Sequence, residues 1–348
     1  MKTYKLKIIL LAFGSVFLTS CNKLLYTSLD VLRPAKVAFE PEAKRLLIVN
    51  NSVTQPSDYG HKTLLTNEKP KNIDVITDSL SIFCLGALTE DMDEKNFFSS
   101  VLLLPNSINT SKNFTSINKL NSEDVKKLCS SNHADAILSL DKIKVNDEIS
   151  EYYLNDAGSY LSTFEVKYET SWSIHYPNKS NATTIQFNDT VFWEAESYFR
   201  KKGLNELPNR KDGLIDGALN VGQKSVNRFV PYWEKVDRYF FDSKNKLMKQ
   251  GMDSVYVKNW TAAIDCWKKA LDKTKNIATK GYATNNIAIA YEITGDLDKA
   301  IDYATQSYNF MCESPFAEFK NYMRIMEYIN ELGQRKKDNV IIKKQLGE

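Results

Sequence analysis

The chain has 348 residues, of which 43% are hydrophobic and 11% aromatic, the composition of a globular protein long enough for two domains. Its formal charge is +3, but Lys2, Lys5 and Lys7 lie in an N-terminal segment that we expect to be removed, which leaves 43 basic against 43 acidic residues. Such a near-neutral chain is not expected to bind nucleic acid, whose phosphates require a basic stripe.

The N-terminus has the pattern of an export signal. The three lysines precede an apolar run over 8–18, which is shorter than the roughly twenty residues of a membrane-spanning helix but has the length of a signal-peptide core. Leu18-Thr19-Ser20-Cys21 follows and resembles the lipobox of bacterial lipoproteins. The resemblance implies a signal peptide over 1–20 and acylation of Cys21, including palmitate.

The residues after Cys21 bear on localisation. In many Gram-negative bacteria, an aspartate directly after the acylated cysteine resembles an inner-membrane retention signal, and here that position is Asn22. The acidic cluster that resembles a surface-export signal is also absent from the residues that follow. We therefore expect an outer-membrane lipoprotein that faces the periplasm, held by its acyl chains. Residues 21–40 are predicted to form an extended lipidated tether.

Residues 41–200 are predicted to form an α/β domain. Short apolar runs flanked by polar residues, typical of buried strands, occur within 45–51, 99–105 and 134–140. Helical spacing of apolar residues separates them, and the alternation of strand and helix predicts a small mixed sheet. Alternating segments at 162–176 and 183–194, joined by a polar turn, predict an antiparallel hairpin that extends the sheet.

Residues 201–243 are predicted to be connecting helices. Asp212 is the expected N-cap of the first helix, and Pro231 is expected to kink or end it. A further helix is predicted through Val236, Tyr239 and Phe240.

The C-terminal region, 244–348, contains an internal repeat. The segments 259–271 and 296–308 align, with Ala263 and Ala300 standing 37 positions apart. A small residue followed by an aromatic and a Gly-Asp turn precedes the second copy. The pattern resembles the tetratricopeptide repeat, with packing positions at Gly251, Ala263, Trp267, Ala288, Tyr291 and Ala300.

The resemblance implies an all-α repeat domain, in which small residues allow helices to cross closely and Trp267 fills the space between them. Three extra residues separate the copies, and Tyr303 stands one place early for the usual aromatic. Residues 315–332 and 336–346 are predicted to form a third, degenerate pair. The alternative is a plain helical bundle.

Over nearly its whole length, the chain resembles a family of Gram-negative outer-membrane lipoproteins of unknown function. Segments at 32–35, 218–222 and 231–240, together with the repeats, carry this resemblance. The element order of 41–200 is also similar to the small domain of curli-secretion and Tol-type periplasmic lipoproteins. Neither resemblance implies an activity.

No residue pattern predicts catalysis, a cofactor or a metal site. The three histidines, His61, His133 and His175, lie outside metal-ligand spacing, and the acidic cluster 90–94 lacks the glycine of a calcium loop. The cysteines after Cys21 form no Cys-x-x-Cys pair, and are predicted to be buried or to form disulfides in the periplasm. They are Cys84, Cys129, Cys266 and Cys312.

The predicted function is that of a non-enzymatic scaffold or adaptor. Helical repeats present a concave surface that usually binds a protein or peptide partner. The alternative is an envelope glycan-binding or glycan-processing protein that uses the aromatic residues of the hairpin, namely Trp172, Tyr176, Phe192 and Trp193. Packing in the core is the competing interpretation of those four side chains.

Overall fold

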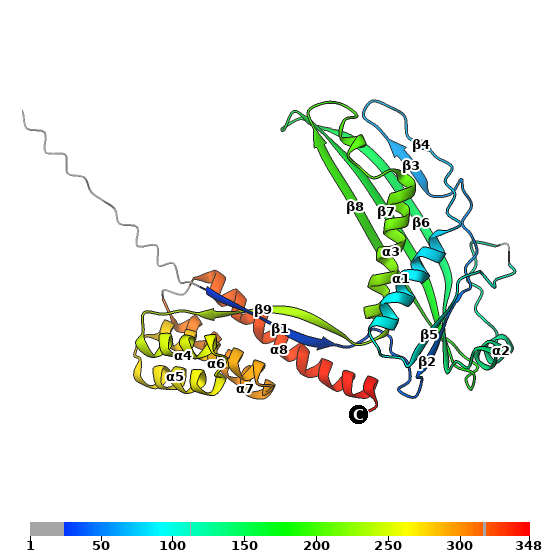
Figure 1. The fold of residues 1–348 in the computed structure, drawn as a ribbon. Coiled ribbons are helices and arrows are strands. Elements are labelled where there is room, and N and C mark those ends of the chain that lie inside the picture. Colours follow the sequence, from blue (N-terminus) through cyan, green and yellow to red (C-terminus); the bar gives the residue numbers. More distant parts are fainter. Residues whose placement is uncertain (1–23, 112, 316–317) are drawn as a thin grey trace, which may run out of the picture. The chain divides into compact units, whose positions relative to one another are not determined.

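The computed structural model describes residues 24–111, 113–315 and 318–348, which form two compact units (Figure 1). The sheet unit comprises Leu32–Trp233 and Asp338–Glu348. The helical unit comprises the described residues up to Val31 together with Glu234–Lys337. The predicted signal peptide and Cys21 lie outside the described residues.

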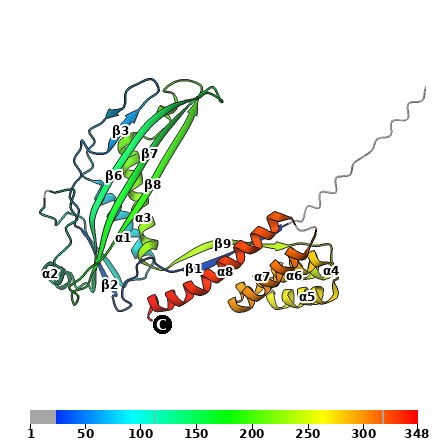
Figure 2. The same cartoon turned by 180° about the vertical axis from the view of Figure 1, so that it is seen from behind.

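The sheet unit contains a seven-stranded mixed sheet. Its parallel part has the order β5-β2-β6, and β3 pairs in parallel with the second half of β6. The strands are β2 (Arg45–Asn50), β3 (His61–Leu64), β4 (Lys71–Asn72), β5 (Ser100–Leu104), β6 (Ala136–Leu154), β7 (Ser159–His175) and β8 (Thr183–Ser197). The long strands β6, β7 and β8 form an antiparallel ribbon, seen from behind in Figure 2.

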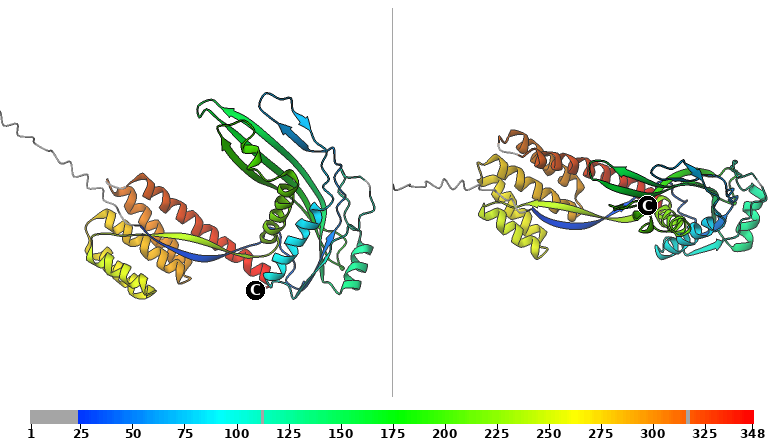
Figure 3. Two further views of the ribbon diagram at one scale, coloured as in Figure 1. Left: turned by 45° about the horizontal axis from the view of Figure 1, so that its top comes forward. Right: turned by 90° about the horizontal axis from the view of Figure 1, so that it is seen from above.

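Helices cover both faces of the parallel strands because β2 is apolar on both sides. Leu46 and Ile48 pack in the cluster that contains α1 (Leu80–Glu94) and α3 (Arg210–Phe229). Leu47 and Val49 pack instead against α2 (Ser122–Asn132). Figure 3 shows α1 and α3 side by side. Gly222 permits this approach, because a Cβ there would lie 2.2 Å from the carbonyl oxygen of Cys84.

The helical unit contains two helical hairpins and a two-stranded sheet. Its elements are β1 (Leu24–Arg33), β9 (Tyr232–Phe241), α4 (Lys246–Tyr256), α5 (Trp260–Lys273), α6 (Ile277–Ile293), α7 (Leu297–Glu313) and most of α8 (Phe319–Leu346). Asparagine or aspartate side chains cap the N-termini of α4 to α7, each accepting a hydrogen bond from a first-turn amide. Gly295 takes a φ of +89° at the turn between α6 and α7.

Small residues allow these helices to pack closely. Ala263, Ala288 and Ala300 are completely buried, as is Trp267. The Trp267 indole lies against Gly251 of α4 and donates a hydrogen bond to the carbonyl oxygen of Met248 (3.2 Å). Tyr291 is half-buried and stacks on Tyr303 with 5.6 Å between ring centroids. The likeness to tetratricopeptide repeats stays a prediction.

The predicted fold class, a small α/β domain followed by an all-α repeat domain, is wrong. The sheet has seven strands, and three of them are 15 to 19 residues long. The helical unit is not all-α, because it contains β9 paired with β1. The extent of β6 was missed because its second half alternates buried residues with charged ones beyond Leu140, where the apolar run ends.

Three local predictions also need correction. Residues 232–241 form strand β9 and not a helix, because the aromatic side chains of Phe240 and Phe241 are both buried on opposite sides of an extended chain. Residues 319–346 form one helix, since nothing breaks α8 at Gly333. The first residue of α3 follows Asn209, whose side chain, not that of Asp212, caps the helix.

Two glycine-to-alanine substitutions should have opposite effects on the stability of the helical unit. In Gly251→Ala, the new Cβ would lie 2.2 Å from Nε1 of the buried Trp267, so we expect a loss of about 1–3 kcal/mol from overpacking. In Gly333→Ala, the Cβ would meet no atom within 4 Å, so helix propensity should add up to about 1 kcal/mol.

Hydrogen-exchange mass spectrometry of the full chain measures both effects locally. Peptides from α4 and α5 should exchange faster in Gly251→Ala, and peptides from α8 should exchange more slowly in Gly333→Ala. Unchanged exchange of α4 and α5 in Gly251→Ala would show that Trp267 does not pack tightly on this position.

Candidate functional site

Asparagines of α6 bind one edge of β9. The Asn286 side chain accepts a hydrogen bond from the Phe241 amide (2.8 Å) and donates one to the Phe241 carbonyl oxygen (2.8 Å). Asn285 donates to the carbonyl oxygen of Tyr239 (3.1 Å). These carboxamides take the place of a neighbouring strand, which buried backbone groups otherwise need.

The side chains of β9 alternate between two aromatic clusters. Phe240 is completely buried and lies 5.7 Å from the ring of Trp267, centroid to centroid. Phe241 stacks on Tyr282 of α6 at 4.6 Å. The strand is therefore an integral part of the core of the helical unit.

A buried ion-pair network joins β9, α6 and α8. Both oxygens of Glu292 accept hydrogen bonds from Arg238, at 2.7 and 2.8 Å, and Arg238 also contacts Glu331 at 2.8 Å. The Tyr328 hydroxyl donates to Glu292 (2.8 Å), and Arg335 forms a further ion pair with it. Arg238 is 5% exposed and Glu292 is 2% exposed.

The surroundings of this network shift two pKa values. Burial of the Arg238 guanidinium disfavours its charge, but hydrogen bonds and attraction from Glu292 and Glu331 outweigh burial and raise its pKa. Burial, together with the charge of Glu292, raises the pKa of Tyr328 well above its ordinary value. Both groups keep their protons, so the network is a set of fixed donors around one carboxylate.

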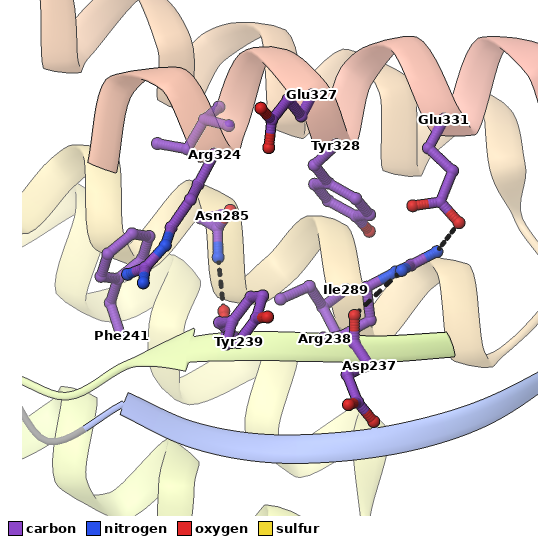
Figure 4. A pocket seen from close by; sticks show the side chains of 11 residues that line it. Asp237, Arg238, Tyr239, Phe241, Asn285, Ile289, Arg324, Glu327, Tyr328 and Glu331 are labelled. Carbon is purple, nitrogen blue, oxygen red and sulfur yellow. Dashed lines mark hydrogen bonds and ion pairs between the residues drawn. The ribbon is translucent and has the colours of Figure 1, made fainter. Parts of the chain in front are cut away.

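A pocket of about 110 Å³ opens beside this network, between β9, α6 and α8 (Figure 4). Its lining is apolar or aromatic at Tyr239, Phe241, Ile289, Ile325 and Tyr328. The rest of the lining is polar or charged, namely Asp237, Arg238, Asn285 and three residues of α8, Arg324, Glu327 and Glu331. The Arg324 guanidinium lies 5.3 Å from the centre of the Tyr239 ring, and Glu327 is exposed. Neither forms an ion pair with any residue that the structure describes.

The pocket is suited to binding and shows no catalytic arrangement. Of the acids in its lining, Glu331 is held in an ion pair with Arg238, and no serine, threonine, cysteine or histidine lines it. Within residues 24–111, 113–315 and 318–348, no three His, Cys, Asp or Glu side chains are placed to hold a metal ion. An apolar floor with charged residues of both signs around it can hold an uncharged side chain of a partner.

The predicted packing residues lie behind this pocket and do not line it. Gly251, Ala263, Trp267, Ala288 and Ala300 lie in the core of the helical hairpins. The residues that sequence reasoning missed are Arg238, Asn285, Asn286 and Glu292. The predicted helix over 232–241 hid Arg238, but the two adjacent asparagines in an otherwise apolar stretch of α6 were a usable signal of buried polar contacts.

Each of the three histidines has a structural role in the fold. His61 is buried and contacts Asp147, which also pairs with Arg210. His175 contacts the Ser139 hydroxyl at 3.1 Å, and burial lowers its pKa. His133 ends α2 in a left-handed conformation with a φ of 53°.

The remaining candidates are mostly core residues. Cys84 and Cys129 are buried, Cys266 is half-buried and Cys312 is exposed, and all four are free thiols. Of the hairpin aromatics, Trp172 and Tyr176 are buried and Trp193 stacks on Phe164, which leaves Phe192 exposed. The four therefore do not form a common exposed surface.

The fold and the pocket define a protein with a mixed-sheet unit and a unit of helical hairpins that binds one of its own strands. Residues 43–241 match the profile of a domain of unknown function, DUF8603, which is more than half of the chain. The chain belongs to this family. Residues 249–334 match a second domain of unknown function, DUF6340. No curated protein is significantly similar to the chain.

Several solved structures are distantly similar. An uncharacterized protein shares 9% identity with a TM-score of 0.23, covering 56% of this chain and 95% of its own. A putative neuraminyllactose-binding hemagglutinin homolog from Helicobacter pylori shares 11% identity with a TM-score of 0.26, covering 53% and 82%. A hypothetical protein from Chlamydia trachomatis shares 11% with a TM-score of 0.18, covering 53% and 91%. Likeness at this level carries no functional conclusion.

Breaking the buried network should destabilise the helical unit far more than breaking an exposed ion pair. Arg238→Met leaves Glu292 buried with fewer donors, and we expect a loss of about 3–5 kcal/mol in the free energy of unfolding. Arg238→Met combined with Glu292→Gln should cost less than the sum of the two single substitutions, because the orphaned carboxylate is gone.

Thermal unfolding followed by circular dichroism, with hydrogen exchange of α6 and α8, measures this coupling. Lys336→Ala is the control, because the exposed pair between Lys336 of α8 and Asp298 of α7 should contribute almost nothing. Additive costs in the double variant would show that Arg238 and Glu292 do not interact energetically.

Proposed function

We propose that this protein is a membrane-anchored periplasmic lipoprotein that acts as a non-enzymatic adaptor. The helical unit would bind a protein partner at the pocket between β9, α6 and α8. The observation that carries the proposal is the pocket itself, with an apolar floor and with Arg324 and Glu327 at its rim, neither of which forms an ion pair with a described residue.

The size of the pocket supports recognition of a single side chain. An apolar cavity of about 150 Å³ is known to hold a benzene molecule, so about 110 Å³ suits one aliphatic or small aromatic side chain. Buried anchors of this kind dominate the free energy of many protein interfaces. The charged rim would orient the partner through complementary charges.

The position of β9 limits where a partner can bind. In helical-repeat proteins the concave surface usually binds an extended peptide. Here Asn285 and Asn286 of α6 already bind the backbone of the chain's own strand. The proposed partner therefore docks beside β9, along α8.

The anchoring half of the proposal rests on the N-terminal residues. A basic and then apolar leader ends at Leu18-Thr19-Ser20-Cys21, and several acyl chains on one cysteine give stable membrane attachment. In the part of the chain that the structure describes, no helix is long and apolar enough to span a membrane. Glycan binding by the hairpin aromatics is less favoured, because Phe192 alone of the four is exposed.

A photo-crosslinking amino acid at the pocket rim should capture the partner in living cells. With p-benzoylphenylalanine in place of Glu327, we expect an adduct of discrete mass, because the side chain would lie within the interface. The matched control carries the same amino acid at Lys269, which is exposed on α5 and does not line the pocket.

Reversing the rim charge with Arg324→Glu should weaken the adduct from position 327 several-fold. Adducts of equal intensity from both positions, or none from position 327, would contradict docking at the pocket.

Membrane attachment should depend on one cysteine. Cys21→Ser should abolish incorporation of labelled palmitate and release the protein from the membrane fraction, because its acyl chains supply the apolar surface that enters the bilayer. Cys312→Ser is the matched control, since Cys312 is a free and exposed thiol. Undiminished labelling of the Cys21→Ser protein would exclude the lipoprotein assignment.

A further inference from the structure

In the sheet unit, the connections between the parallel strands change direction at β2. The chain leaves β2 and returns to β5 through α1, which packs on one face, and then passes through α2 on the other face to β6. Strand β2 lies between β5 and β6. At such a switch point the connections leave in opposite directions, and the carboxyl ends of the strands border a crevice in which ligands commonly bind.

A cavity of about 720 Å³ lies beyond the carboxyl ends of β2 and β5. Asn51, which directly follows β2, lines it together with residues 108–111 and 118–120 and one side of α2. Its volume falls within the range of roughly 300–1,000 Å³ typical of small-molecule sites.

Hydrogen bonds to the surrounding protein fix the orientation of the Asn51 side chain. Its side-chain nitrogen donates to the carbonyl oxygen of Asn118 (2.6 Å) and to the carboxylate of Asp141 (2.9 Å). Asp141 is buried and also accepts hydrogen bonds from Ser139 (2.8 Å) and Ser173 (2.5 Å). Because a backbone carbonyl has no proton to donate, the nitrogen of Asn51 must point inward.

The oxygen of the Asn51 carboxamide is available to a ligand. Asn51 is 3% exposed, yet its Oδ1 accepts no hydrogen bond from any residue that the structure describes. Asn51 lines the cavity, and a carboxamide oxygen can accept up to two hydrogen bonds. A hydroxyl or amide group of a molecule in the cavity would donate to this oxygen.

The cavity wall also carries unpaired positive charge. Lys119 and Lys127 are exposed, line the cavity and form no ion pair with a described residue. The one acidic side chain in the lining, Asp124, accepts a hydrogen bond from Asn121 (2.7 Å). Ammonium groups at the mouth of a cleft favour an anionic ligand.

We propose that this cavity binds an anionic sugar of one or two rings, with its carboxylate or phosphate at Lys119 and Lys127 and a hydroxyl donating to Asn51 Oδ1. The lining is rich in carboxamides and hydroxyls, namely those of Asn109, Asn118, Thr110, Ser111 and Ser131. Ile108, Leu120 and Leu128 offer small apolar surfaces for the ring carbons. This site is independent of the pocket in the helical unit.

Isothermal titration calorimetry on the full chain in detergent micelles tests the proposal with three probes. Glucuronate and glucose 6-phosphate supply the carboxylate and the phosphate, and glucose is the neutral control. We expect saturable binding of at least one anion, and glucose should bind at least about tenfold more weakly. Binding of only one of the two anions would identify the charged group of the natural ligand.

Substitutions at the mouth of the cavity distinguish a specific binding site from general electrostatic attraction. Lys119→Gln combined with Lys127→Gln changes two exposed side chains and should weaken binding roughly tenfold or more. Lys126→Gln is the matched control, because Lys126 is equally exposed on α2 but does not line the cavity. Absence of binding by both anions at millimolar concentration, equal binding of glucose, or unchanged affinity in the double variant would overturn the proposal.

Discussion

Glu292 is the residue on which the helical unit depends. Its buried carboxylate accepts hydrogen bonds from Arg238 and Tyr328 and pairs with Arg335, so that one side chain of α6 holds both β9 and α8. The desolvation of a charge is expensive, and only several well-placed donors compensate for it. The asparagines beside it complete the arrangement, because Asn285 and Asn286 pair the backbone groups of Tyr239 and Phe241. The apolar floor of the pocket follows from this constraint, since β9 and α8 are fixed on either side of Ile289.

The sheet unit follows a different principle. Strand β2 is apolar on both faces, which requires helices on both faces and sends the chain alternately to one side and the other. That alternation produces the crevice at the carboxyl ends of β2 and β5. Buried polar side chains such as Asn51 and Asp141 gather where the apolar runs end, and they hydrogen-bond to one another there. In each unit, therefore, a buried carboxylate lies behind the proposed binding surface.

Most of the local secondary structure could be predicted from the sequence, but little of the way in which the elements pack together could. The apolar runs predicted β2, β5 and the start of β6, and alternation predicted the pairing of β7 with β8. Strand β9 could not be predicted by the same means, because Val236, Tyr239 and Phe240 also satisfy helical spacing. Its conformation is set by partners such as Asn286, 45 residues further along. Likewise, nothing local marks Arg238 as buried, since its charge is compensated only by residues of α6 and α8.

The long sequence separation of these contacts bears on how the helical unit can fold. Arg238 is synthesised 54 residues before Glu292 and 93 residues before Glu331. Until α8 has left the ribosome, the two hairpins lack the helix that completes the network, and the guanidinium of Arg238 must stay in water. Non-local contacts of this kind slow folding, because loop entropy is lost before the contacts form. A chain cut short before α8 would thus uncover Phe241, which packs with Ile325 of α8, and a nascent chain passes through the same vulnerable state.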